Sequence, residues 1–205
     1  MTAHDHEPGS AAHAGQDHHE MGGVTSMAIS ATLHCLTGCA IGEIAGLVIG
    51  TTAGLSNAAT IAISVALAFT FGYSLSTLPL LKAGLALRTA LLTVLAADTL
   101  SILTMEIVDN AVMAVLPGAM NAGLVNVVFW VGMMVSLIAA FAAAVPVNRH
   151  LLLRGRGHAL THEYHGARTA PGWRRVIPTF GPGALAAAIF AFMLGGLLVA
   201  IADEL

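Results

Sequence analysis

Five apolar segments, each long enough to cross a lipid bilayer as a helix, constrain this chain more than any other feature. They lie at residues 27–50, 57–81, 85–107, 122–147 and 180–202. About 20 apolar residues in a helix span the hydrocarbon core of a membrane, which is about 30 Å thick. The composition agrees, because only 9% of the residues are charged, against about 25% in soluble domains. The sequence therefore predicts an all-α, polytopic membrane protein with about five transmembrane helices.

The basic residues predict how these helices are oriented. All of them lie in two segments that a five-helix topology puts on the same side of the membrane: Lys82, Arg88, Arg149, Arg154, Arg156, Arg168, Arg174 and Arg175. Cytoplasmic segments of membrane proteins are enriched in Lys and Arg. We therefore expect a multi-pass protein of the inner, cytoplasmic membrane, with the N-terminus in the cytoplasm and the C-terminus outside. A net charge of −3 and basic residues confined to membrane-flanking segments argue against nucleic acid as a partner.

The sequence divides into four parts. Residues 1–26 form a polar, His-rich cytoplasmic tail with too few apolar residues to fold alone, so we expect it to be disordered. Residues 27–147 form a transmembrane core of four helices. Residues 148–178 are a cytoplasmic segment rich in Arg and His, and residues 179–205 contain the fifth transmembrane helix.

The first apolar segment carries polar groups that are costly in hydrocarbon. Cys35, Cys39 and Glu43 recur every four residues and so share one helical face, with His34 adjacent. Next to this face runs a glycine stripe, a series of glycines at the same spacing: Gly38, Gly42, Gly46 and Gly50. Small residues at this spacing let another helix approach closely. Because ionisable residues in membrane helices almost always face a protein interior, we expect the polar face to be buried in the protein.

The third apolar segment contributes a second set of candidate ligands. Asp98, Met105 and Asp109 are spaced to share one face, and Glu106 is adjacent. Counting 1.5 Å per residue from the same membrane surface puts Asp98 near the level of Cys39. The same count puts Glu43 near Met105, and it leaves Glu106 and Asp109 near the outer mouth of a pathway.

These groups have the chemistry of metal ligands. Thiolates, imidazoles and thioethers bind soft ions such as Cu(I), whereas carboxylates suit harder or borderline divalent ions. We predict an intramembrane metal site that contains His34, Cys35, Cys39, Glu43 and Asp98, with Met105 as a weaker candidate. The alternative interpretation is structural, because cysteine often packs as a small buried hydrophobe and methionine fills gaps in cores.

Two groups of histidines lie outside the apolar segments. The tail contains His4, His6, His13, His18 and His19, interspersed with acidic residues. Such a tract is typical of loose metal capture, and an ordinary solvated tail or an expression tag is the alternative. In the segment after the fourth span, His158, His162 and His165 would share one face of a helix and could bind zinc or copper. The alternative there is an interfacial segment at the lipid headgroups.

Several motifs together resemble one prokaryotic integral-membrane family, catalogued as domain of unknown function 4396. They are HCLTGCAIGE at 34–43, FGYSLSTLPLLKAG at 71–84, AADTLSILTMEIVDNAVM at 96–113 and PVNRHLLLRGRGHALTHEYH at 146–165. The resemblance covers roughly residues 28–166. It implies a small multi-helix membrane domain, an association with copper and no established reaction, and the fifth span lies outside it.

From these features we expect a membrane protein that binds and moves a transition-metal ion and is not an enzyme. Copper is the favoured ion and zinc the alternative, and a homo-oligomer joined through the glycine stripe would enclose the path. Two other classes remain open. One is a copper-holding assembly or chaperone subunit for a respiratory oxidase. The other is a membrane protein that conducts protons or other ions, or that carries out thiol redox chemistry.

Overall fold

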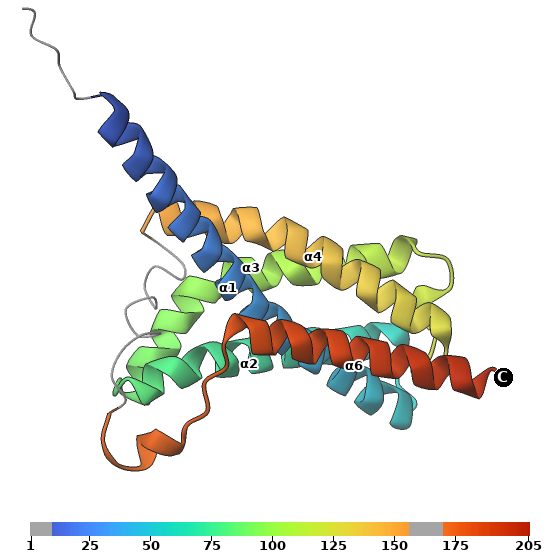
Figure 1. Cartoon of the computed structure of the whole chain (residues 1–205). Helices are drawn as coiled ribbons and strands as arrows, with labels where there is room; N and C mark the ends of the chain where they lie inside the picture. Colours follow the sequence, from blue (N-terminus) through green and yellow to red (C-terminus); the bar gives the residue numbers. More distant parts are fainter. Residues whose placement is uncertain (1–9, 156–169) are drawn as a thin grey trace, which may run out of the picture.

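The chain folds into a bundle of long helices, seen in a computed structural model that describes residues 10–155 and 170–205, with side chains for residues 23–155 and 170–205 (Figure 1). The long helices are α1 (Ser10–Thr52), α2 (Asn57–Lys82), α3 (Leu87–Val115), α4 (Val127–Leu153) and α6 (Pro182–Asp203). Among the described residues there are no strands, and five helices are long and apolar enough to cross a membrane. The prediction of an all-α protein with about five such helices is confirmed.

Three helices differ from the limits expected from hydropathy. The helix α1 begins at Ser10, so its backbone includes part of the polar segment that we assigned to the tail. The helix α3 continues to Val115, past the acidic residues that interrupt its apolar run, because these residues face the protein interior instead of ending the helix. The helix α4 starts later than expected, at Val127, since a turn and the short 3₁₀ helix η1 (Ala119–Asn121) precede it.

The helices α1 and α2 form the most extensive contact in the bundle, and the glycine stripe makes this contact close. A Cβ atom at Gly38 would overlap the backbone of Gly72, and one at Gly42 would overlap that of Ala68. The same relation holds for Gly46 with Ser64 and Gly50 with Thr60. The contact therefore advances four residues along each helix in opposite directions, as expected for antiparallel neighbours.

The glycine stripe was predicted to let another helix approach closely, and the helix that packs on it is α2 of the same chain. All four of its positions are covered by α2. The expectation that this stripe joins two copies of the chain was therefore wrong, because its surface is already buried. A homo-oligomer stays a prediction, and it would need a different surface.

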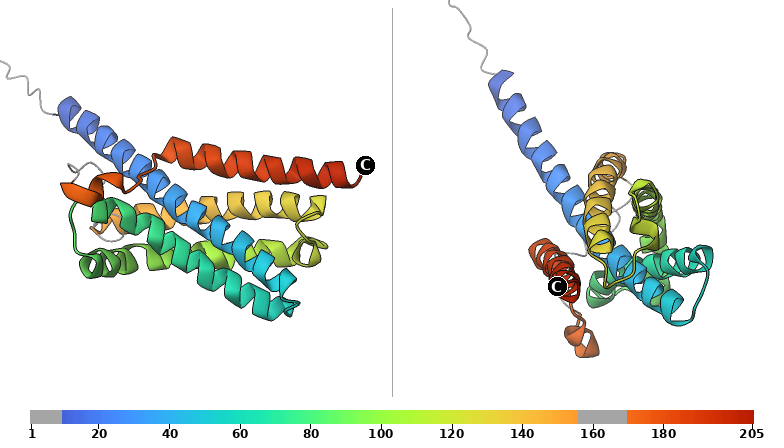
Figure 2. Two further views of the ribbon diagram at one scale, coloured as in Figure 1. Left: turned by 90° about the horizontal axis from the view of Figure 1, so that it is seen from below. Right: turned by 90° about the vertical axis from the view of Figure 1, so that its right-hand side faces the viewer.

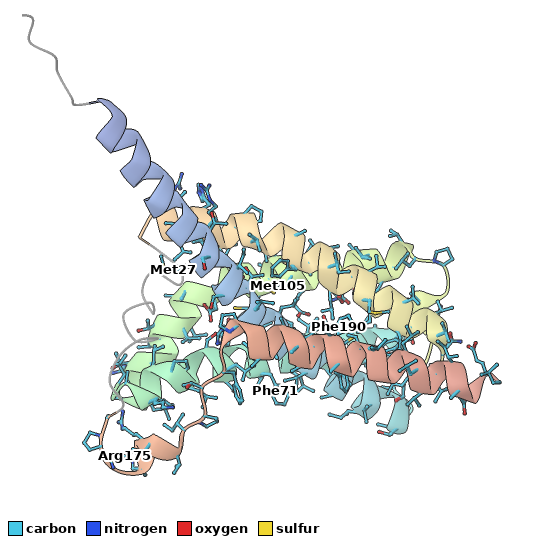
Figure 3. The ribbon with its side chains drawn as sticks, in the orientation of Figure 1. Met27, Phe71, Met105, Arg175 and Phe190 are labelled. Carbon is cyan, nitrogen blue, oxygen red and sulfur yellow. The ribbon has the colours of Figure 1, made fainter. Side chains whose placement is uncertain are left out.

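The helix α6 lies against α1 and α4 at the side of the bundle (Figure 2). Trp130 of α4 fills the space above Gly196, where a Cβ atom would overlap its ring. The same ring meets Phe192 edge-on, with centroids 5.7 Å apart. Most other side chains of α6 are exposed, including Phe190 at 68%. In Figure 3, Phe190 is labelled on this outer helix, and Met105 is labelled in the interior of the bundle. An apolar exposed face of this kind is suited to contact with lipid.

The two ends of the bundle differ in charge. One end, here called the basic end, carries Lys82 at the end of α2, Arg88 at the start of α3, and Arg149 and Arg154 at the end of α4. The 3₁₀ helix η3 (Gly172–Val176) adds Arg174, whose guanidinium donates to the carbonyls of Leu81 and Leu85 at 2.8 and 2.9 Å. The opposite end, here called the far end, contains the turn between α1 and α2, the helix η1 and the end of α6.

Candidate functional site

Polar side chains of α1 meet polar side chains of α3 at three successive levels inside the bundle. The Cys35 thiol lies against the carboxyl group of Asp98. One turn further along α1, Cys39 lies against Glu106, and one turn beyond that Glu43 lies against Asp109. We call these three pairs the polar ladder. The pairs follow one another because α1 and α3 run in the same direction. The α1 residues are four apart, whereas the α3 residues are eight and three apart, and both spacings are close to whole helical turns.

The first pair of the ladder is surrounded by hydroxyl groups. Cys35 and Asp98 are completely buried, and the thiol also lies against Ser76 of α2 and Ser101 of α3. The structure has both cysteines as free thiols. This pair therefore sits where α1, α2 and α3 converge, in surroundings that offer weak hydrogen-bond donors and acceptors to the thiol and the carboxyl group.

The second and third pairs contain carboxyl oxygens that the protein does not satisfy. Glu43, Glu106 and Asp109 are 7%, 4% and 5% exposed. Among the described residues, nothing forms a hydrogen bond with Oε2 of Glu43, either carboxyl oxygen of Glu106, or Oδ1 of Asp109. Burying an ionised carboxylate without a partner is very costly. These positions are therefore suited to hold a proton or to bind a cation.

A cavity of about 210 Å³ connects the third pair with the far end. Glu43 and Asp109 line it at its buried side, and the exposed residues Thr51, Asn57 and Asn121 line it at the far end. We call this cavity the vestibule. Its described lining contains no Lys, Arg or His, so its fixed ionisable groups are acidic.

His34 has a role in the structure that competes with metal binding. Its Nδ1 lies 2.9 Å from the carbonyl oxygen of Ser30, and its Nε2 lies 3.1 Å from that of Phe180, just before α6. A carbonyl oxygen accepts hydrogen bonds, whereas a metal needs a deprotonated ring nitrogen. His34 would therefore have to leave at least one of these carbonyls to bind a metal, and as placed it connects α1 with α6.

The depth estimates from the sequence were off by one or two helical turns. Asp98 pairs with Cys35 instead of lying at the level of Cys39, and Glu43 meets Asp109 instead of Met105. Helices that cross at an angle do not keep a common depth along their length, which is why counting from the membrane surface misplaced these pairs. Glu106 and Asp109 lie within the ladder, and Asp109 also lines the vestibule that reaches the far end.

The remaining predicted ligands are placed as follows. Met105 is buried in the core beside the ladder residues of α1. The candidates His158, His162 and His165 lie outside the described residues. In the part of the chain whose side chains are described, no group of three or more His, Cys, Asp or Glu residues is arranged to hold a metal ion. The ladder thus consists of pairs, and the expected single midplane site with His34, both cysteines and two carboxylates is not assembled.

The structure adds several hydroxyl and amide groups that the metal-ligand interpretation did not select. The amide of Asn148 on α4 donates to Thr32 Oγ1 at 2.8 Å and to Ser101 Oγ at 2.9 Å. Ser76 lies beside Cys35, and Ser136 of α4 lies beside Asp109. Isolated Ser, Thr and Asn residues in an apolar segment are a weak signal for buried contacts between helices, but nothing in the sequence says which helices they join.

Comparison with protein families identifies the class to which the four-helix core belongs. The family described as a domain of unknown function, DUF4396, matches residues 25–157, which is more than half of the chain. The protein is therefore a member of the DUF4396 family, as the motifs indicated. The matched residues include the whole polar ladder, whereas α6 lies beyond them. No curated protein and no solved structure matches the chain.

Proposed function

We propose that this protein binds a transition-metal ion and moves it across the cytoplasmic membrane along the polar ladder. The observation that carries the proposal is the pairing of Cys35, Cys39 and Glu43 with three carboxyl groups of α3. Ionisable groups are rare in membrane helices and mark ion pathways when they occur inside a bundle. Here they form a connected series that ends at a cavity.

The donor atoms of the ladder favour a cation that accepts both sulfur and oxygen ligands. Copper and zinc bind thiolate ligands, and carboxylates extend the range to other divalent ions. A cation in the vestibule would first meet Glu43 and Asp109, then Glu106 with Cys39, and finally Asp98 with Cys35. Sites made of pairs hold an ion more weakly than a closed four-ligand site, which suits passage better than storage.

Proton conduction is a second candidate that one observation favours. At the third pair two carboxyl groups face each other, and a carboxyl oxygen on each has no hydrogen-bond partner among the described residues. Two adjacent carboxyl groups that share a proton are a recurrent device in proteins. In this alternative the ladder would pass protons between carboxyl groups, and the thiols would be structural neighbours.

The first test is transport by the full chain in proteoliposomes that enclose a metal-sensitive fluorophore. We expect copper or zinc to enter, and Glu106→Gln to reduce the rate by about tenfold or more, because it removes a charged ligand from the middle pair. The matched control is Glu204→Gln, since Glu204 is an exposed acid after the end of α6. A pH-sensitive fluorophore in parallel vesicles measures proton movement.

The outcomes separate the classes of function. Metal flux that depends on Glu106 supports transport. Proton flux without metal flux supports the second candidate and contradicts metal transport. Metal bound to the purified protein without flux of either kind contradicts both and points to a copper-holding assembly subunit. We also propose that the chain is not an enzyme and that its N-terminus is cytoplasmic, as the charge of the basic end indicates.

A further inference from the structure

The vestibule has features of a binding site that are separate from the thiol pairs. Glu43 and Asp109 line it, while Cys35, Cys39 and Asp98 do not. Its other polar lining comes from α1, α2, α3 and η1 and consists of hydroxyl and amide groups, among them Ser64 and Asn110. The vestibule is therefore an oxygen-rich and nitrogen-poor surface with two acids at its buried side.

The two acids that line this cavity each have one carboxyl oxygen without a hydrogen-bond partner among the described residues. These oxygens are Oε2 of Glu43 and Oδ1 of Asp109, and both are buried. The other polar groups nearby are partly used, since the Ser64 hydroxyl donates to the Glu43 carbonyl at 3.3 Å and the Asn110 amide donates to the Glu106 carbonyl at 2.9 Å. Both bonds end on backbone carbonyls, so neither uses a carboxyl oxygen of Glu43 or Asp109. The two acids lie against each other, and Ser136 lies beside Asp109.

The size of the cavity decides in what form an ion fits. About 210 Å³ is on the order of ten times the space that one water molecule needs. A bare ion would be far from most of the walls, whereas an ion with its water ligands would reach them. The amide and hydroxyl groups of the lining are suitable hydrogen-bond partners for such water ligands.

These features select a chemical class of ligand. Hard divalent cations such as Mg²⁺ and Mn²⁺ are bound through one or two carboxylates while they keep several water ligands. Such a site needs no third protein ligand, which agrees with the absence of three-residue metal clusters among the described side chains. Soft ions such as Cu(I) bind thioethers, and three methionines, Met113, Met120 and Met133, also line the vestibule. The buried lining atoms without a hydrogen-bond partner among the described residues are nevertheless carboxyl oxygens, which favour the harder ions.

We propose that the vestibule is a loading site for a hydrated divalent cation, which Glu43 and Asp109 bind through their carboxyl groups. This inference rests on the proposed transport function and adds that the transported metal ion enters with its water ligands still bound. Water ligands are then removed at the narrower ladder, where the next donors are Glu106 and Cys39.

The test uses Mn²⁺ and the purified full chain in lipid nanodiscs. Free hydrated Mn²⁺ gives a six-line electron paramagnetic resonance signal that is lost on binding, and pulsed measurements in ²H₂O detect water ligands on the bound ion. We expect one Mn²⁺ per chain with water ligands retained, and displacement by Mg²⁺. Glu43→Gln and Asp109→Asn should each weaken binding by about tenfold or more. Glu43→Asp, which keeps a carboxylate, should weaken it less.

One control locates the site. Glu204→Gln should bind Mn²⁺ as the unchanged protein does, because Glu204 lies after the end of α6 and does not line the vestibule. No Mn²⁺ binding, or binding unaffected by both Glu43→Gln and Asp109→Asn, would overturn the proposal. Loss of binding in Glu204→Gln, or a bound ion without water ligands, would also contradict it. If Glu43→Gln does not fold, the loss of Mn²⁺ binding in Asp109→Asn and the displacement of Mn²⁺ by Mg²⁺ test the proposal instead.

The binding and transport results can fail independently. Mn²⁺ bound in the vestibule without flux in proteoliposomes would leave the loading site in place and contradict transport. Metal flux that depends on Glu106 in a protein without vestibule binding would support transport and contradict the loading site.

Discussion

Asn148 shows how a single polar residue can hold three membrane helices together. Its amide is 1% exposed and donates hydrogen bonds from α4 to Thr32 of α1 and Ser101 of α3. Ser101 in turn lies beside Cys35. The position of the first ladder pair therefore depends on a side chain that is not part of the ladder.

We expect Asn148→Ala to lower the free energy of unfolding by about 1–3 kcal/mol, since two hydrogen bonds between helices are lost in a buried environment. Unfolding in mixed detergent micelles, followed by circular dichroism, measures this change. Asn121→Ala is the matched control, because Asn121 is exposed and its side chain accepts one hydrogen bond, from Asn57. Equal stability of the two variants would show that Asn148 does not connect the helices.

At the scale of elements, the packing of α1 on α2 decides which face of α1 remains for the ladder. The glycine stripe occupies one face of α1 and is covered by α2. The adjacent face, with Cys35, Cys39 and Glu43, is then turned toward α3. A change in the α1–α2 contact would therefore be expected to displace the polar ladder as well.

Gly42→Ala tests this contact. Its added Cβ would overlap the backbone of Ala68, so the helices must separate, and we expect a loss of about 1–3 kcal/mol in the free energy of unfolding. Gly23→Ala in the same helix is the control, since nothing lies within 4 Å of a Cβ there. It should be neutral or stabilise by up to about 1 kcal/mol, because alanine favours helix over glycine. Thermal unfolding of both variants in detergent checks the difference, and a neutral Gly42→Ala would contradict the close contact.

For the whole molecule, the basic end and the vestibule lie at opposite ends of the bundle. If the basic residues face the cytoplasm, the vestibule opens to the outside, and Glu43 and Asp109 are reached from that side of the membrane. Arg174 strengthens the basic end structurally, because it attaches the segment before α6 to the turn between α2 and α3.

Reporter fusions to the full chain test this orientation. We expect alkaline phosphatase fused after Leu205 to be active and green fluorescent protein at the same position to be dark, because the C-terminus follows an odd number of spans from a cytoplasmic N-terminus. The same reporters inserted between residues 156 and 169 should give the opposite pattern. Fluorescence at the C-terminus would reverse the orientation and place the vestibule on the cytoplasmic side.

The sequence alone predicted which residues form the polar ladder better than it predicted which of them pair with each other. Cys35, Cys39 and Glu43 were expected on one face because helical periodicity is local, and they lie on one face. The partners of these residues were misplaced by one or two turns because the crossing of α1 and α3 is set by contacts with α2 and α4. The contact between His34 Nε2 and the carbonyl oxygen of Phe180 could not be predicted from the sequence, since it joins residues far apart in the chain.

The amino-acid sequence by itself determined that the described part of the chain forms five helices long and apolar enough to cross a membrane. It also determined which polar groups these helices bury. These properties follow from hydropathy and helical period, which depend on neighbouring residues only. The tertiary structure alone decided that the glycine stripe serves α2 within the same chain, that thiols pair with carboxyl groups, and that a cavity ends at Glu43 and Asp109. Each of these depends on how helices distant in sequence pack together, because buried groups in a membrane must find their partners on neighbouring helices.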